Sequence, residues 1–481
     1  MNSSKFYLFL VFFLLNCSII ESELRWAFEI FRHGARTPYS GMTKDFKDCF
    51  GVQWEGIKEL TGVGLRQHFL VGYRNYLRYI KENNLIKEKY DPREVYLIST
   101  DSNRTIMSAN AQVQGLYLPG TGPTLNEKQS KVAVPPVEGE EIYKEEKDIL
   151  DENDYTALPN KMNIMPIHNF FTKDHFIQLQ DKKVCPGSKK YYDENQKREE
   201  VRLFLQEMNE KYGAQLNQTL IEEQRVKDAL LDYTRAYYIF DTIIAQYTEG
   251  KDEYENIAEI LGPDILNDSF KFFDLDLVGN GINHDSELCI YSMSPIFDRI
   301  LNWTQAKINK DIKGDLNYTE YDLPKFVMFS AHDSTCGAFM GFMKATFGSE
   351  IRYPYFATNI NLELRKEGSE YKEDNYMVDY FINDELMGSF KYTDFRDKIN
   401  NIKKSKKEIN KFCQFDGEEK TEDDDDDDDD DIYLAVNIVL SIFSVILIVL
   451  IFLTIKRKNL AKKNNIDEMD GVDGLLGKND N

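Results

Sequence analysis

The chain has 481 residues, of which 42% are hydrophobic, so it can build a sizeable core. Its formal net charge of −23 argues against a nucleic-acid partner. Any site for an anionic ligand must therefore be locally basic, and clustered arginines are the feature that would mark it.

Residues 1–22 are typical of a secretory signal peptide. Lys5 precedes an unbroken apolar stretch, 6–15, that is too short to span a membrane. Ser22 is the preferred cleavage position and Ser18 the alternative. Sequons of the Asn-x-Ser/Thr type agree with a secreted domain, and glycosylation is predicted at Asn217, Asn267, Asn302 and Asn317.

The hydrophobic pattern of residues 23–416 predicts an α/β core with a mainly parallel sheet flanked by helices. Short buried strands are expected at 25–31, 94–99 and 325–330, and helices at 60–80, at 103–116 and after Asp333. The 60–80 segment has apolar residues at the spacing of an amphipathic helix, namely Leu65, Phe69, Tyr73, Tyr76, Leu77 and Ile80. The charged, mostly helical region at about 135–246 is interpreted as a cap inserted into the core.

The C-terminal part predicts a membrane anchor. Residues 417–431 end in nine consecutive aspartates and are expected to form an extended acidic stalk; calcium binding is less favoured because a flexible run lacks a fixed cage. The 24 uncharged residues 432–455 would form a helix of ~36 Å, long enough to cross a bilayer. Basic residues follow, so the tail 456–481 is expected to be cytoplasmic. The chain is thus interpreted as a single-pass type I membrane protein of the secretory pathway, in a lysosome, another acidic vacuole or the cell surface.

A motif at 31–38, FRHGARTP, directly follows the first predicted strand. Ligands in open α/β sheets bind beyond the carboxyl ends of strands. There, a neutral His33 can attack phosphorus, while Arg32 and Arg36 offer planar forks that match phosphate oxygens. Gly34 is expected to leave room for the substrate to approach the backbone.

FRHGARTP resembles the signature of the histidine acid phosphatases, a branch of the phosphoglycerate-mutase-like histidine phosphatase superfamily. Further blocks of that family are similar, in the same order, to segments 59–67, 95–118, 326–339 and 355–364. The similarity covers about 25–413 and is weak in the cap. It implies a phosphoglycerate-mutase-like core with an inserted helical cap, and an acid phosphatase that forms a phosphohistidine on His33.

The resemblance also implies roles for other residues. Arg104 would be a third phosphate-binding arginine, at a helix N-terminus that favours anions. His332 would contact the phosphate, and Asp333 would protonate the leaving oxygen, although it can also serve as a helix cap. His168, in a Pro-x-His segment, would contact substrate. The sequon at Asn103 is predicted to stay unmodified because a glycan there would crowd the pocket.

Cysteine usage agrees with an oxidising compartment. By the resemblance, Cys185 and Cys413 are expected to pair and to tie the cap region to the end of the core. The count of five cysteines beyond the signal allows a second disulfide and one leftover thiol among Cys49, Cys289 and Cys336, and their pairing stays open. No cofactor or metal is expected, because the chain has no paired Cys-x-x-Cys or His-Glu-x-x-His motif.

Three alternatives are weighed against this hypothesis: a phytase-like phosphatase, a phosphoglycerate-type mutase and a non-catalytic surface protein on the same fold. The presence of every expected site residue favours catalysis, and the signal and anchor argue against a cytosolic mutase. The expected partners are small phosphomonoester substrates and the membrane. The oligomeric state is open, with a homodimer among the options.

Overall fold

The computed structural model describes residues 22–39, 44–133, 155–169, 179–220, 231–279, 286–314 and 323–415. These residues belong to one compact unit that extends to Phe415. The predicted signal peptide (apart from Ser22), stalk, membrane anchor and tail lie outside the described residues. Within the described ranges, no helix is both long and apolar enough to cross a membrane.

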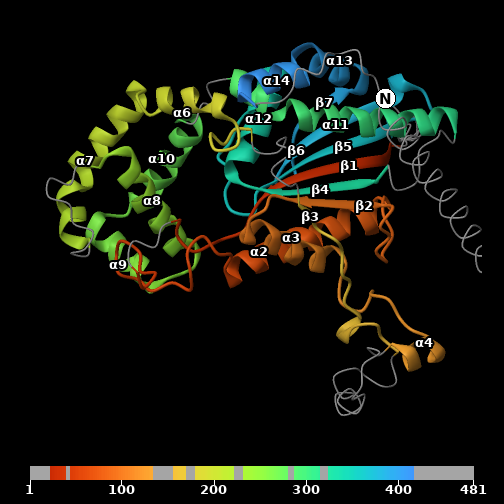
Figure 1. Ribbon diagram of the computed structural model, residues 1–481, viewed down its shortest axis with the longest axis horizontal. Helices are drawn as coiled ribbons and strands as arrows, with labels where there is room; N and C mark the ends of the chain where they lie inside the picture. The colour runs from red at the N-terminus through yellow and green to blue at the C-terminus, as the bar shows by residue number, and fades with distance from the viewer. Residues whose placement is uncertain are drawn as a thin grey trace, which may run out of the picture. The chain divides into compact units, whose positions relative to one another are not determined.

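A seven-stranded sheet in the order β3-β2-β4-β1-β5-β6-β7 forms the core (Figure 1). The strands are β1 (Ser22–Arg32), β2 (Val95–Ser99), β3 (His168–Asn169), β4 (Phe326–Ala331), β5 (Asn359–Glu367), β6 (Tyr376–Ile382) and β7 (Glu385–Lys391). β1, β2, β3 and β4 are parallel to one another. β5 is antiparallel to β1, β6 is antiparallel to β5, and β7 is antiparallel to β6. The expected α/β fold with a mostly parallel sheet is therefore confirmed.

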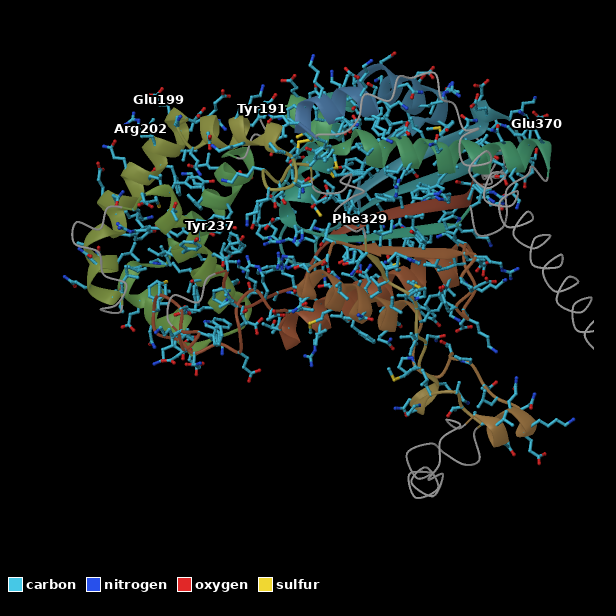
Figure 2. The ribbon with its side chains drawn as sticks, in the orientation of Figure 1. Tyr191, Glu199, Arg202, Tyr237, Phe329 and Glu370 are labelled. Carbon is cyan, nitrogen blue, oxygen red and sulfur yellow. A yellow bond between two sulfur atoms is a disulfide. The ribbon has the colours of Figure 1, made fainter. Side chains whose placement is uncertain are left out.

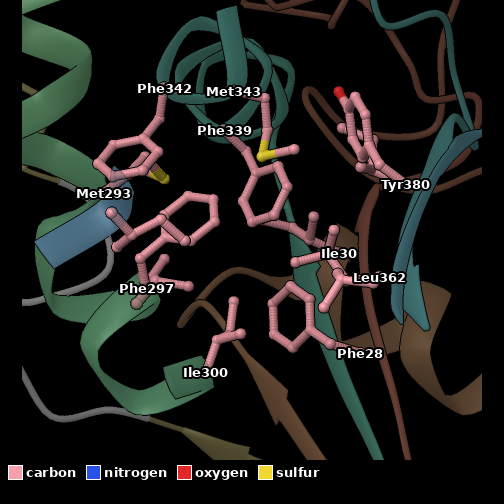
Figure 3. Packing of buried hydrophobic residues seen from close by; sticks show 14 of the residues in the cluster. Phe28, Ile30, Met293, Phe297, Ile300, Phe339, Phe342, Met343, Leu362 and Tyr380 are labelled. Atoms are coloured by element: carbon pink, nitrogen blue, oxygen red, sulfur yellow. The ribbon is translucent and has the colours of Figure 1, made fainter. Parts of the chain in front are cut away.

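Helices cover both faces of this sheet (Figure 1). One face carries α2 (Gly62–Asn75), which continues into the π-helical turn η1 (Tyr76–Glu82), and α3 (Asn103–Leu116). The other carries α11 (Ser286–Lys313), α12 (Asp333–Phe347), α13 (Tyr392–Ile402) and α14 (Lys406–Cys413). Because β1 is buried on both faces from Trp26 onward, its residues from Trp26 to Phe31 are apolar except for Glu29. Phe28 and Ile30 pack with Phe297 of α11 and Phe339 of α12 (Figure 3), whereas Ala27 and Phe31 face the α2–α3 side.

A separate group of helices lies beyond the carboxyl ends of the central strands (Figure 1). It comprises α6 (Lys189–Asn195), α7 (Glu199–Thr219), α8 (Tyr233–Thr248), α9 (Asp252–Leu261) and α10 (Ile265–Gly279). α7, α8, α9 and α10 share a hydrophobic cluster that includes Phe204, Phe240 and Phe272. This helical region continues past Gln246, the expected end of the cap, to Gly279. The remaining short elements are α4 (Glu127–Val132), η3 (Pro159–Lys161), η5 (Pro186–Ser188) and η7 (Glu373–Asn375).

α2 packs through its small and polar residues instead of its apolar stripe. Its buried positions are Gly64, His68, Val71, Gly72 and Asn75, whereas Leu65, Phe69, Leu70, Tyr73 and Leu77 are 37–53% exposed. The glycines explain this choice, because a Cβ at Gly72 would collide with the backbone of Gln112 and one at Gly115 with that of Phe69. The close backbone contact with α3 therefore turns most of the predicted apolar stripe toward solvent, whereas its last member, Ile80 in η1, is buried.

The predicted disulfide is confirmed: Cys185 and Cys413 are bonded, across a sequence separation of 228 residues. The bond joins the segment before η5 to the end of α14, in a small cluster with Leu179 and Ile409. It is the one disulfide in the part of the chain that the structure describes, so the second one that the cysteine count allowed is not formed there. Cys49 is buried in the cluster of the helical region, whereas Cys289 and Cys336 are both buried in the core cluster beside the sheet.

Candidate active site

Adjacent parallel strands place the expected site residues next to one another. β1 ends at Arg32 and β4 at Ala331, and these two residues are register partners. His33 and His332 therefore leave the sheet side by side, with their ring centroids 5.6 Å apart. α3 starts just after the end of β2 and brings Arg104 to the same edge.

His33 is 2% exposed and has a defined tautomer. Its Nδ1–H donates to the carbonyl of Gly34 at 2.9 Å, so a neutral ring has its lone pair on Nε2. Burial, followed by the charges of Arg104, Arg32 and Arg36, holds the pKa of His33 well below 6.5. These causes favour the neutral ring over the protonated one.

The backbone after His33 is held by both helices on that face. Gly34 N–H donates to Ser108 Oγ of α3 at 3.1 Å, and Ala35 N–H donates to Gln67 Oε1 of α2 at 2.8 Å. A Cβ at Gly34 would lie 2.5 Å from the carbonyl oxygen of Gly64. Gly34 is thus required by contact with the start of α2, which differs from the expected reason, room for the substrate.

Arg32 is fixed on several sides. Its Nη1 donates to the Tyr353 hydroxyl at 3.0 Å and to the Pro354 carbonyl at 2.8 Å, and its guanidinium lies 4.3 Å from the Phe356 ring centroid. Nη2 forms an ion pair with Asp333 Oδ2 at 2.8 Å. Its Nε is buried without a hydrogen-bond partner among the described residues.

Arg36 has a partner that was not predicted from the sequence. Asp241 of α8 accepts from Arg36 Nη2 at 2.8 Å and from Nη1 at 3.2 Å, a bidentate pair that links the helical region to the site. Asp241 also accepts from Tyr39 N–H at 2.6 Å. One turn earlier on α8, Tyr237 (Figure 2) meets the Tyr39 ring edge-on, with centroids 5.6 Å apart.

His332 lies between Arg104 and Thr100. Arg104 Nη2 is 3.3 Å from His332 Nδ1, and His332 Nε2 is 3.0 Å from Thr100 Oγ1. Because the guanidinium can only donate, Nδ1 is the acceptor and His332 is the neutral Nε2–H tautomer. Burial and Arg104 lower the pKa of His332 to about 3. Burial and Arg36 lower the pKa of Arg104 to about 10, so it remains charged in acid.

Asp333 is the first residue of α12, and His332 is the N-cap residue. The Asp333 side chain therefore does not occupy the cap position, although its Oδ1 accepts from Ser334 N–H at 2.7 Å. Burial acts to raise the pKa of Asp333, but the charges of Arg32 and Arg36 outweigh it and lower the pKa below 3.8. With no ligand bound, Asp333 is an ionised carboxylate.

The remaining predicted positions lie apart from this cluster. His168 is exposed on β3, and its ring stacks on Tyr96 with centroids 4.7 Å apart. Asn217, Asn267 and Asn302 are exposed, and Asn317 lies outside the described residues. Asn103 is exposed and donates to Glu59 Oε1 at 3.1 Å. No group of three or more metal-ligating side chains is found in the described ranges.

Three arginines therefore surround one neutral histidine at the ends of parallel strands, and the buried Nε atoms of Arg32 and Arg104 have no partner among the described residues. Buried, positively charged N–H donors without a partner favour the binding of an anion, and the planar guanidinium group matches the spacing of phosphate oxygens. The fold and the site thus define an α/β protein with a histidine in a basic pocket that is suited to an anion.

Comparison with known proteins gives the family. The model of the histidine phosphatase superfamily (branch 2) matches residues 23–383, and the chain belongs to this family, as a hydrolase of the histidine acid phosphatase type. It is 26% identical over 348 residues to lysosomal acid phosphatase of Xenopus laevis, covering 72% of this chain and 67% of that protein. It is 24% identical over 368 residues to the human lysosomal enzyme, covering 76% and 71%. Among solved structures, the apo form of Hafnia alvei phytase has the same fold, with a TM-score of 0.52, 12% identity and coverage of 80% and 97%.

Proposed function

We propose that the protein hydrolyses phosphate monoesters in acid through a phosphohistidine formed on Nε2 of His33. The observation that carries this proposal is the state of His33: it is buried among three arginines, it has a depressed pKa, and its Nδ1–H bond to Gly34 leaves the Nε2 lone pair available. A nucleophile that stays neutral in acid is what an acid phosphatase of this type requires.

In the proposed first step, Nε2 attacks phosphorus and the bond from phosphorus to the ester oxygen breaks. Arg32, Arg36 and Arg104 bind the phosphoryl oxygens, where negative charge is concentrated. Asp333 donates a proton to the departing oxygen, and the alcohol leaves. In the second step Asp333 takes a proton from water, the hydroxide attacks the phosphohistidine, and inorganic phosphate and neutral His33 are released.

The ion pair with Arg32 sets a condition on this role of Asp333. A dianionic phosphate that binds Arg32 replaces the carboxylate as its partner and repels it, which raises the pKa of Asp333. The second pKa of a phosphate monoester is about 6, so in acid the substrate is mainly the monoanion. Transfer of its remaining proton to Asp333 gives the bound dianion and the protonated acid. Both ring nitrogens of His332 are hydrogen-bonded in the ligand-free site, Nδ1 to Arg104 and Nε2 to Thr100. His332 can therefore contact phosphate only if one of these two hydrogen bonds breaks.

The cellular setting is part of the proposal. Exposed sequons and the Cys185–Cys413 bond support a lumenal or extracellular location for residues 23–416, and the apolar sequence 432–455 supports one membrane anchor. Protease treatment of sealed microsomes, whose cytoplasmic face is outward, tests this orientation: the tail should be digested, and the glycosidase-sensitive remainder should be protected. Protection of the tail, with digestion of the remainder in intact vesicles, contradicts it.

Trapping tests the mechanism. The full-length protein is quenched during turnover of a ³²P-labelled monoester, and the adduct is tested for acid stability. We expect an acid-labile phosphoenzyme that is absent from His33→Ala, together with loss of turnover. An acid-stable adduct, or full activity in His33→Ala, would exclude the phosphohistidine.

A further inference from the structure

A buried polar cluster lies behind the nucleophile, on the face of the sheet covered by α2 and α3. Its centre is Glu29 of β1, which is 0% exposed and lies between Ala27 and Phe31 on an otherwise apolar face. Three amides donate to its carboxylate: Gln112 at 2.7 Å, Asn75 at 2.8 Å and Asn359 at 3.3 Å. The phosphatase mechanism proposed above uses none of these residues.

The cluster reaches the catalytic loop through His68. Its Nδ1 is 2.9 Å from Gln112 Oε1, and its Nε2 is 3.0 Å from the carbonyl oxygen of Arg32. Arg32 is the last residue of β1, so this carbonyl belongs to the peptide that leads into His33. A carbonyl only accepts, and therefore His68 Nε2 must carry a hydrogen.

The amide of Gln112 links the protonation of His68 to that of Glu29. In one arrangement Glu29 is ionised and accepts from Gln112, whose oxygen then accepts from Nδ1–H of a cationic His68. In the other, Glu29 is protonated and donates to Gln112, whose reversed amide donates to Nδ1 of a neutral His68. In both arrangements His68 keeps its Nε2–H, and Glu29 and His68 together hold one further proton. In both, every donor and acceptor of Glu29, Gln112 and His68 that faces another of the three has a partner.

We propose that Glu29, Gln112 and His68 form a positioning relay that keeps Nε2–H of His68 on the Arg32 carbonyl and so orients the peptide that carries the nucleophile. The proposal rests on the proposed function in assigning the nucleophilic role to His33. His68 is a positioning residue, because it acts through the Arg32 backbone and not on the substrate.

The surroundings favour the neutral arrangement. Burial is the main cause that raises the pKa of Glu29 to about 7 and lowers that of His68 to about 4. The other ionisable groups that act on Glu29 are Arg74 of α2, whose charge lowers its pKa, and Tyr79 of η1, which is itself buried with a raised pKa. The other face of His68 meets the Phe31 ring, at 5.2 Å between centroids.

Two substitutions at His68 separate positioning from packing. Gln can place a donor near the position of Nε2, whereas Asn reaches only the position of Nδ1. The full-length chain is phosphorylated at His33 in single turnovers with an aryl phosphate, and rates are normalised to folded protein. We expect His68→Gln to stay within a few-fold of the parent and His68→Asn to be slower by on the order of 10- to 100-fold, although both lose similar stability. Equal rates in the two variants would overturn the relay.

Thr304→Val is the matched control. Thr304 is buried and bonds the Ile300 carbonyl within α11, on the opposite face of the sheet, so its loss reports on stability alone. It should change the unfolding midpoint without changing the normalised phosphorylation rate. A comparable slowing in Thr304→Val would show that general destabilisation accounts for the His68 result and would remove the proposal.

A readout independent of activity completes the test. The ¹⁵N shifts of histidine-labelled full-length protein, with His68→Gln used for assignment, report which ring nitrogen is protonated. We expect a protonated Nε2 on His68 from pH 4.5 to 6.5. An unprotonated Nε2 would refute the relay, even in a protein that forms phosphohistidine. Absence of phosphohistidine in the parent, with Nε2–H present, would instead count against the proposed function.

Discussion

Asp333 Oδ2 lies 2.8 Å from Nη2 of Arg32, so the expected proton donor is the ion-pair partner of an expected phosphate ligand. The same guanidinium cannot bind carboxylate and phosphate equally well at one time. In the proposed mechanism, substrate binding and protonation of Asp333 are therefore coupled, and this coupling accounts for the acid preference of the proposed reaction.

Asp333→Asn should separate binding from catalysis. Removing the carboxylate frees Arg32 and deletes a negative charge, so inorganic phosphate should inhibit the variant at lower concentration than the parent. Because Asn cannot donate a proton in place of the acid, hydrolysis of an alkyl phosphate should fall by roughly 10²–10⁴-fold in single turnovers. An aryl phosphate, with its better leaving group, should lose less. Equal losses for both substrates would remove Asp333 from the role of donor.

Arg104→Gln should change both affinity and pH dependence. Loss of a desolvated contact to the phosphoryl group should cost ~3 kcal/mol in transition-state stabilisation. The charge of Arg104 also helps to lower the pKa of His33, so its removal lets that pKa rise. The nucleophile then becomes protonated at a higher pH, and the acid limb of kcat/KM should move upward. An unmoved acid limb and unchanged phosphate inhibition would place Arg104 outside the site.

The Glu29–His68 pair should give a plateau of stability in mild acid. Between pH 4.5 and 6.5 the unfolded chain holds one proton on His68, and the folded chain also holds one, so the pair adds no pH slope. Below pH 4.5 the unfolded chain binds the extra proton, and stability falls as pH falls. Above pH 6.5 the folded chain binds the extra proton, and stability falls as pH rises. The difference in urea unfolding free energy between the parent and Glu29→Gln/His68→Gln should follow this course. Each limb should total about 0.7 kcal/mol, because the folded and unfolded pKa values that bound it differ by about half a unit.

Gly34→Ala should destabilise the fold by about 1–3 kcal/mol, because its new Cβ would meet the Gly64 carbonyl at 2.5 Å. Gly62→Ala is the control: no atom lies within 4 Å of a Cβ there, and alanine favours the helix. Urea unfolding of the two variants measures the difference. Equal stability would mean that the loop and α2 can move apart without loss.

Much of the site was predictable from the sequence, because strand ends and motif residues coincide in the chain. FRHGARTP, Arg104 and His332-Asp333 each follow a strand that an apolar run reveals, and the predicted helix at 103–116 has the bounds of α3. Asp241 was not predictable, since an acidic residue on an otherwise apolar helix gives no sign of which arginine it will meet. Thr100 and Glu29 were missed for a similar reason: their partners lie far along the chain.

The orientation of α2 shows a limit of hydrophobic periodicity. The apolar spacing of Leu65, Phe69, Tyr73 and Leu77 correctly indicated a helix, but not the face that packs. Close backbone contact at Gly72 and Gly115 decided that face, and such contact depends on the partner helix as well as on the local pattern. The exposed position of His168 depends likewise on the register of β3 beside β2, which the sequence does not encode locally.

The central place of β1 has a consequence for biosynthesis. This strand emerges first, yet its neighbours come roughly 300 residues later, since Ala27 pairs with Phe326 and Phe31 with Asn359. At about 5–20 residues per second, the apolar strand waits on the order of 15–60 s for its partners. The nascent chain must be shielded from aggregation during that interval, and a ribosome that stops before β4 releases a product that contains His33 but lacks His332 and Asp333.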